Sequence, residues 1–174
     1  MRKNIDSKKL TLSGMFLALA LVMPFLTGQI PQIGAMLCPM HIPVLLCGFF
    51  CGGPMGFLVG LIAPILRSAL FGMPPLFPAA ICMAFELAVY GLISGMLYRI
   101  LPKGKGTVYL SLCSAMVLGR IVWGIAMMLC VGAENFGLAA FAAGAVTGAL
   151  PGIVLQLVLI PVIVLAMERR MEDQ

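Results

Sequence analysis

The sequence predicts an all-α integral membrane protein, a single domain over residues 1–174 that folds as a bundle of six transmembrane helices. Three observations support this prediction. Of the 174 residues, 62% are hydrophobic and only 10% are charged, whereas soluble domains carry about 25% charged residues. Apolar segments follow one another along nearly the whole chain, and each crossing of a bilayer needs about 20 residues. The basic residues gather at the ends of these segments, as is typical of membrane proteins.

The first predicted helix covers residues 10–26. It follows four basic residues and therefore resembles a signal peptide. Because no small-x-small cleavage site follows the apolar run, we expect the segment to be retained as a helix. An uncharged loop that contains Gln29 comes next.

The apolar stretch at residues 36–72 is too long for one crossing and contains a Cys-Gly-Gly-Pro turn signal near its middle. We therefore predict two short helices, over residues 40–51 and 54–71. Each contains a proline, Pro43 in one and Pro64 in the other, so we expect kinks.

The C-terminal half predicts three more helices, over residues 77–97, 107–131 and 137–167. A polar connection at residues 98–106 separates the first two, and a polar tail follows the last. The helix over residues 137–167 is long enough to tilt in the membrane or to begin with a re-entrant stretch.

The distribution of lysine and arginine predicts the orientation. Nine of the eleven lie before the first helix, between the fourth and fifth helices, or after the sixth. With six helices, these three places fall on one side, and the loops on the other side contain neither residue type. The positive-inside rule makes the basic side cytoplasmic, so we expect both termini in the cytoplasm.

Three charged residues lie within predicted helices. Glu86 and Arg120 fall near mid-membrane, and Arg67 falls in the outer third of its helix. Charges at this depth cost at least a few kcal/mol unless they are paired or hydrated. A Glu86–Arg120 ion pair is feasible, and one interpretation is a structural bridge without a ligand. That bridge leaves Arg67 as a surplus positive charge, and a guanidinium suits a carboxylate or phosphate. Our hypothesis is a small anionic ligand that binds from outside.

Other residues are candidates for the same substrate-binding site. Trp123 lies one turn outward from Arg120 on the same helix face, where it can stack on a ligand or serve as an interfacial anchor. His41, near an outer helix end, is either a ligand contact or a packing residue. Gln29 and Asn135 lie in outer loops and could close over a ligand.

The sequence also argues against several classes of protein. No phosphate-binding loop, Ser/His/Asp arrangement or metalloprotease pattern is present, so we expect no enzyme and no cofactor. The six cysteines are interpreted as small buried hydrophobes, because no dense His/Cys/acid cluster completes a metal site. The net charge of +5 does not indicate nucleic-acid binding, because the basic residues occupy helix ends.

Four segments carry a family resemblance. They are LSGMFLALA at residues 12–20, PMHIPVLLCG at 39–48, GGPMG at 52–56 and RSALFGMPP at 67–75. With the small size, the six helices and the basic N-terminus, they resemble the substrate-binding S components of energy-coupling factor (ECF) vitamin transporters. The resemblance covers nearly the whole chain.

The resemblance implies a binding subunit in a prokaryotic plasma membrane. Such a subunit captures a vitamin or related micronutrient at the extracellular face. It works with a transmembrane coupling subunit (T component) and two cytoplasmic ATPases that drive uptake. Family members dock through an Ala-x-x-x-Ala patch on the first helix. The matching positions here are Gly14 and Ala18, so glycine replaces the first alanine.

The resemblance also implies a place for the ligand, between the loop after the first helix and the outer halves of the last three helices. Glu86, Arg120, Trp123 and Asn135 fall in this zone. The surplus arginine favours an anionic vitamin, with pantothenate as the first choice and niacin, biotin or folate as others. Two alternatives remain: a stand-alone secondary transporter of a small organic anion, with Glu86 as its coupling acid, and an assembly subunit without a ligand.

Overall fold

The computed structural model describes residues 7–27, 36–102, 104–132, 134–144 and 148–172, and these ranges contain helices and no β-strand. In chain order the helices are α1 (Ser7–Val22), the 3₁₀ helix η1 (Met23–Thr27), α3 (His41–Cys51), α4 (Gly53–Phe71), the short π-helical segment η2 (Leu76–Ala80), α5 (Ile81–Ile100), α6 (Lys105–Val131), α7 (Leu138–Ala142) and α8 (Leu150–Glu172).

Five of these segments are long and apolar enough to cross a membrane, and they are α1 with η1, α4, η2 with α5, α6, and α8. The all-α, membrane-type bundle is therefore confirmed. The remaining predicted crossing, the helix over residues 40–51, corresponds to α3, which is apolar but has only 11 residues. At 1.5 Å per residue it extends about 17 Å, which is shorter than the ~30 Å hydrocarbon core of a bilayer.

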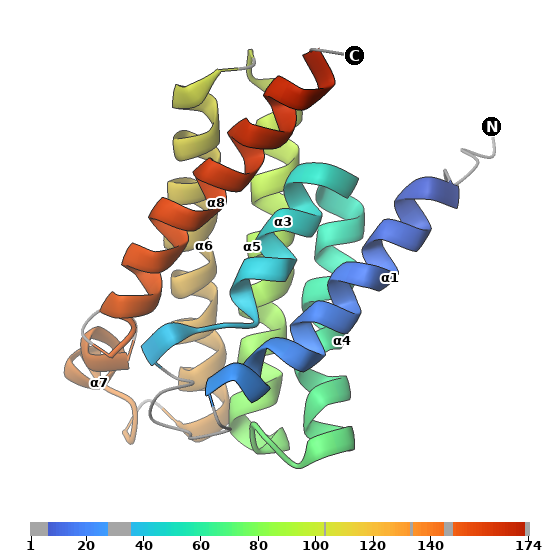
Figure 1. Ribbon diagram of the computed structural model, residues 1–174. Helices are drawn as coiled ribbons and strands as arrows, with labels where there is room; N and C mark the ends of the chain where they lie inside the picture. Colours follow the sequence, from blue (N-terminus) through green and yellow to red (C-terminus); the bar gives the residue numbers. More distant parts are fainter. Residues whose placement is uncertain (1–6, 28–35, 103, 133, 145–147, 173–174) are drawn as a thin grey trace, which may run out of the picture.

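The helices alternate in direction, and the basic residues gather at one end of the bundle. The start of α1, the α5–α6 connection and the end of α8 all lie at the top of Figure 1. We call this the basic end, and its described members are Lys8, Lys9, Arg99, Lys105, Arg169 and Arg170. The helices η1, η2 and α7 lie at the opposite end. The predicted clustering of basic residues on one side thus agrees with the arrangement of the helices.

Helix α3 is the centre of the bundle. Ten of its eleven residues are buried, from His41 to Phe49 together with Cys51. It packs against α1, α4, α5 and α8. A helix that is apolar all around needs such surroundings, because no face of it is suited to water. Pro43 lies in the first turn of α3, where its missing N–H removes no helical hydrogen bond.

Glycines bring the backbones of α3, α4 and α5 into direct contact. A Cβ atom added to Gly91 of α5 would lie 2.3 Å from the carbonyl carbon of Gly56 in α4. A Cβ atom added to Gly48 of α3 would lie 2.6 Å from the Gly91 carbonyl oxygen. These distances are far below van der Waals contact, so the three helices meet only because side chains are absent at these positions. Small residues serve this purpose at helix interfaces in membranes.

A side chain of α5 stabilises the turn between α3 and α4. Gly52 takes a positive φ of 96°, which favours glycine. The guanidinium of Arg99 donates a hydrogen bond to the carbonyl oxygen of Cys51 at 2.9 Å. A cation at this place also interacts favourably with the C-terminal end of the α3 helix dipole.

The predicted sixth helix over residues 137–167 is wrong as one continuous element. The structure contains the short α7 and then α8, and residues 145–147 between them lie outside the described part. Gly144 and Gly148 border the interruption, and Pro151 follows in the first turn of α8. Glycine weakens a helix and proline favours its first turn, so this composition explains where α8 begins.

Two other predicted helices are modified near one end. The first ends earlier as an α-helix, because η1 takes over at Met23 and contains Pro24. The fourth begins with η2, in which Phe77 has non-helical angles of φ −118° and ψ 133°. Pro64 lies inside α4, which continues to Phe71.

We expect the variant Gly91→Ala to lower the stability of the bundle by about 1–3 kcal/mol, the usual cost of inserting an atom into a well-packed interior. The added Cβ atom would meet backbone rather than a flexible side chain. Thermal unfolding of the purified protein in detergent measures the change. Gly106→Ala is the matched control, because a Cβ atom there has no neighbour within 4 Å. Equal melting temperatures for both variants would contradict the assigned helix contact.

Candidate functional site

A buried carboxylate lies where α3, α5 and α6 meet. Glu86 of α5 is 1% exposed, and its Oε1 atom lies 3.0 Å from NH1 of Arg120 in α6. The same oxygen lies 3.4 Å from Nε2 of His41, the first residue of α3. An isolated charge in an apolar bundle is costly, so a carboxylate there requires partners. We call Glu86, Arg120 and His41 the charged triad, after its carboxylate and its guanidinium.

Two further side chains surround the charged triad. Tyr90 lies four residues after Glu86 on the same face of α5, and its ring meets the His41 ring edge-on at 5.2 Å. Gly119 makes room for this tyrosine, because a Cβ atom there would lie 2.1 Å from the Tyr90 ring. Cys38 accepts a contact from NH2 of Arg120 at 3.6 Å. A thiol is a weak hydrogen-bond acceptor, so this contact with the guanidinium is weak.

The segment before α3 has an unusual backbone that positions Cys38. Its φ angle is +47°, the one positive value among the described non-glycine residues. Its carbonyl oxygen accepts the N–H of His41 at 3.1 Å and so closes the turn that begins α3. Helix α8 packs closely on this segment, since a Cβ atom on Gly152 would lie 2.7 Å from the Met36 carbonyl oxygen.

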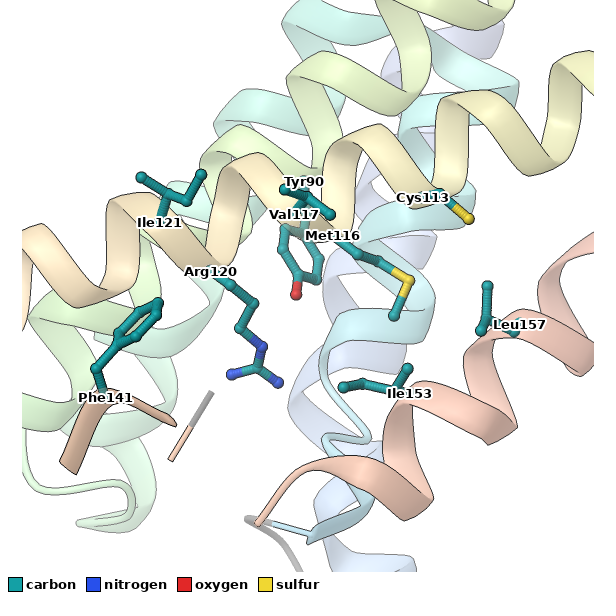
Figure 2. A pocket seen from close by; sticks show the side chains of 9 residues that line it. All are labelled: Tyr90, Cys113, Met116, Val117, Arg120, Ile121, Phe141, Ile153 and Leu157. Atoms are coloured by element: carbon teal, nitrogen blue, oxygen red, sulfur yellow. The ribbon is translucent and has the colours of Figure 1, made fainter. Parts of the chain in front are cut away.

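A cavity of about 380 Å³ adjoins the charged triad. Its lining residues come from α5, α6, α7 and α8, and they are Tyr90, Cys113, Met116, Val117, Arg120, Ile121, Phe141, Ile153 and Leu157. Figure 2 shows the guanidinium of Arg120 extending from α6 into this space, towards α8. Ligand sites of small molecules usually combine such apolar walls with a few polar groups.

Within the described residues, two of the three guanidinium nitrogens of Arg120 have a polar contact. NH1 meets Glu86 and NH2 meets Cys38. The buried Nε atom has no hydrogen-bond partner within the described residues. The Arg120 side chain is 15% exposed, compared with 1% for Glu86 and 2% for His41. Arg120 is also the member of the charged triad that lines the cavity.

Aromatic side chains close the cavity near α7. The ring of Trp123 lies 5.6 Å from Phe136, nearly perpendicular to it, and 6.3 Å from Phe141. Phe141 itself lines the cavity, and the Trp123 ring also covers Gly144. Trp123 thus packs within the protein, and its neighbour Phe141 is the aromatic ring that faces the cavity.

Arg67 has its contacts elsewhere. Its NH1 atom donates a hydrogen bond to the carbonyl oxygen of Leu21, at the end of α1. The guanidinium lies over the rings of Phe25 and Phe71, 5.0 and 5.2 Å from their centres. A cation held between aromatic faces is stabilised without an anion. The charge that the sequence leaves unbalanced is thus accommodated by a carbonyl and two rings, and it joins α4 to α1 and η1.

The remaining sequence candidates are Asn135, Gln29 and the pair Gly14 and Ala18. Asn135 is exposed, and its side-chain amide donates to the carbonyl oxygen of Val131 at 3.1 Å, at the end of α6. Gln29 lies outside the described residues. On α1, Gly14 and Ala18 are both exposed, and a Cβ atom on Gly14 would have no neighbour within 4 Å.

Sequence reasoning missed several residues around the charged triad. Tyr90 could have been found, because it follows Glu86 by one helical turn. Cys38 and the cavity-lining Ile153 and Leu157 of α8 had no such signal. Their proximity to Arg120 depends on a rare backbone angle and on the way α8 packs against the bundle.

The apolar bundle, the buried charges and the cavity beside them are the features of a membrane-type helical protein with a candidate small-molecule site. The profile of the family "ECF transporter, substrate-specific component" matches residues 8–164. The chain belongs to this family of S components, a family of transporter subunits rather than enzymes. Comparisons with curated proteins and with solved structures gave no match.

We expect Glu86→Gln to destabilise the ligand-free protein, because it leaves the Arg120 guanidinium without its counter-charge. Breaking a buried pair on one side costs about 3–5 kcal/mol. The double variant Glu86→Gln/Arg120→Gln should lose less stability than the two single variants lose together, because the partners interact directly. Thermal unfolding of all three in detergent gives the coupling.

The control for the loss of a carboxylate is Glu134→Gln, which changes an exposed residue and should not alter the melting temperature. Strictly additive effects of the two triad substitutions would show that the 3.0 Å contact contributes nothing to stability.

Proposed function

We propose that this S component captures a small organic anion, a vitamin or related micronutrient, for ATP-driven uptake by partner subunits. The ligand's carboxylate pairs with Arg120, and its body occupies the adjoining cavity. The observation that supports this most directly is the partly used guanidinium of Arg120, which extends into a cavity of about 380 Å³.

The charged triad explains how such a site keeps an arginine ready for an anion. Glu86 balances the charge of Arg120 while the cavity is empty of ligand. His41 lies 3.4 Å from the same Glu86 oxygen. The carboxylate therefore keeps a polar neighbour when Arg120 also binds the ligand. Cys38 is a weaker acceptor than a carboxylate and is readily exchanged for one.

The proposed orientation places the ligand on the extracellular side. The positive-inside rule assigns the basic end to the cytoplasm of a prokaryotic cell. The cavity receives Phe141 from α7, which lies at the opposite end. The exposed Gly14 and Ala18 on α1 are the proposed docking patch for the coupling subunit, which connects the chain to two ATPases.

Among carboxylate vitamins, pantothenate is our first choice; niacin and biotin also carry one carboxylate, and folate carries two. We expect Arg120→Gln to weaken binding of the cognate anion by about tenfold or more, because a charge-assisted hydrogen bond is lost. Titration of the purified chain with these four compounds, after mass spectrometry of any co-purified small molecule, measures this.

Two controls separate binding from folding. Glu86→Gln/Arg120→Gln removes both charges together and should show the same weakened binding, although its charge balance is restored. Arg169→Gln removes one charge at the basic end and should bind normally. Unchanged affinity in Arg120→Gln would rule out the proposed role of the guanidinium, and a protein that binds no anion at all would favour a purely assembling subunit.

We expect Gly14→Trp to abolish assembly with the coupling subunit and to leave ligand binding intact, because a large side chain would project from an open helix face. Co-purification with a tagged coupling subunit measures assembly. Val162→Trp, at a residue that is also exposed but on α8, is the matched control and should assemble normally. Loss of binding together with assembly in Gly14→Trp would contradict the docking role.

A second candidate function is a stand-alone secondary transporter of a small organic anion. The contact between His41 and Glu86 favours it, because a proton-coupled carrier needs ionisable groups inside its bundle. Uptake into vesicles that contain only this chain, without ATP, would support this candidate. Dependence of uptake on the coupling subunit and ATP would support the S component.

A further inference from the structure

We propose that the ligand is an amphipathic monocarboxylate, with a single anionic group on a compact apolar body. This inference rests on the proposed function, because it takes the cavity beside Arg120 as the binding site. It adds the chemical class of the ligand, which is determined by the charge available in the site and by the chemistry of the cavity walls.

The charge available in the cavity allows at most one anionic group. Arg120 is the only charged residue among the nine that line it. Part of its charge is already used by Glu86 at 3.0 Å. A second anionic group on the ligand would therefore lie against uncharged walls and opposite a buried carboxylate. Since an unpaired charge in an apolar environment is strongly disfavoured, a dianion does not suit this site.

The walls of the cavity are suited to an apolar body. Six lining residues are aliphatic, aromatic or thioether side chains without a hydrogen-bonding N or O atom, and they are Met116, Val117, Ile121, Phe141, Ile153 and Leu157. Apart from Arg120, the lining side chains offer only the Tyr90 hydroxyl and the Cys113 thiol. Hydroxyl or amide groups along a ligand's body would lose their water and find few partners.

The geometry separates the anionic group of the ligand from its body. In Figure 2, Arg120 points from α6 towards α8, and Ile153 and Leu157 of α8 face the same space from the other side. A carboxylate at the guanidinium therefore directs the attached chain along the seam between α6 and α8, beside the flexible side chain of Met116. Thioethers adapt well to the shape of apolar ligands.

The seam is open at the side of the bundle. Val117 and Ile121 line the cavity and are 60% and 46% exposed, so they also belong to the outer surface of α6. In a membrane this surface faces hydrocarbon rather than water. An apolar ligand body can occupy such an opening without losing hydrogen bonds, whereas the hydroxyl groups of a polar body would lie next to lipid. This independent feature favours the same class of ligand.

Four probes test the inference on the full chain in lipid nanodiscs, with binding to empty nanodiscs subtracted. Octanoate has the carboxylate and the apolar body, octanamide lacks the charge, and octanedioate has a second carboxylate. Pantothenate serves as a monocarboxylate with a polar body. We expect octanoate to bind at least about tenfold more tightly than the other three, because each of them leaves a polar group or charge unpaired.

Two variants of the chain show where each part of the ligand binds. Arg120→Gln should remove the preference for octanoate over octanamide. Ile153→Thr, which places a hydroxyl in the wall, should narrow the preference for octanoate over pantothenate. The neighbouring Val154→Thr is the matched control, because Val154 is 58% exposed and does not line the cavity, and it should leave every preference unchanged.

The outcomes distinguish this inference from the proposed function. If pantothenate or octanedioate binds as tightly as octanoate and Arg120→Gln abolishes that binding, the ligand class is wrong while the anion site stands. If none of these carboxylates binds, the ligand class is likewise wrong; if all of them bind equally well to Arg120→Gln, the proposed function itself is overturned. The comparison of probes on the unchanged chain does not depend on the folding of any variant.

Discussion

The carboxylate of Glu86 must be neutralised inside an apolar bundle, and most of the site's geometry follows from this requirement. One oxygen of this group lies within reach of Arg120 from α6 and His41 from α3. Three different helices must therefore present polar groups at the same depth. The same arrangement holds the arginine at the edge of a cavity. A single buried charge thus connects the stability of the bundle with the anion site that we propose.

Close backbone contact is the second condition for this geometry. Gly48, Gly56 and Gly91 allow α3, α4 and α5 to approach more closely than side chains would permit. The short α3 can therefore lie in the centre of the bundle, with nearly every residue buried. Its first residue, His41, is thereby placed against Glu86. Larger residues at the glycine positions would separate α3 from α5 and move the imidazole away from the carboxylate.

The two intramembrane arginines illustrate how different environments stabilise the same group. Arg120 has a carboxylate, a thiol and a cavity as its surroundings. Arg67 has a backbone carbonyl and two aromatic rings, so its charge is satisfied without an acid. In the sequence, both residues are arginines within an apolar segment, and nothing there distinguishes them. Only their neighbours distinguish a guanidinium that joins helices from one that lines a cavity.

Several parts of this description could be predicted from the sequence because they depend on hydropathy along the chain. The bounds of α3, α4 and α6 were predicted to within about two residues, since glycine, proline and charge interrupt the apolar runs there. The basic end also followed from the sequence, because lysine and arginine avoid hydrocarbon wherever the fold permits. The depth of Glu86 and Arg120 made their pairing feasible, and the two groups do lie in contact.

The sequence by itself determined that the chain is a helical membrane bundle, where most of its helices lie, and which charges are placed at membrane depth. The tertiary structure decided that His41 shares the Glu86 oxygen, that Arg67 turns to aromatic rings, and that α7 and α8 are separate. It also decided that α8 provides a wall of the cavity. The physical reason is that hydropathy fixes the depth of a residue along the membrane normal. The direction in which its side chain points depends on how each helix is rotated and packed against its neighbours.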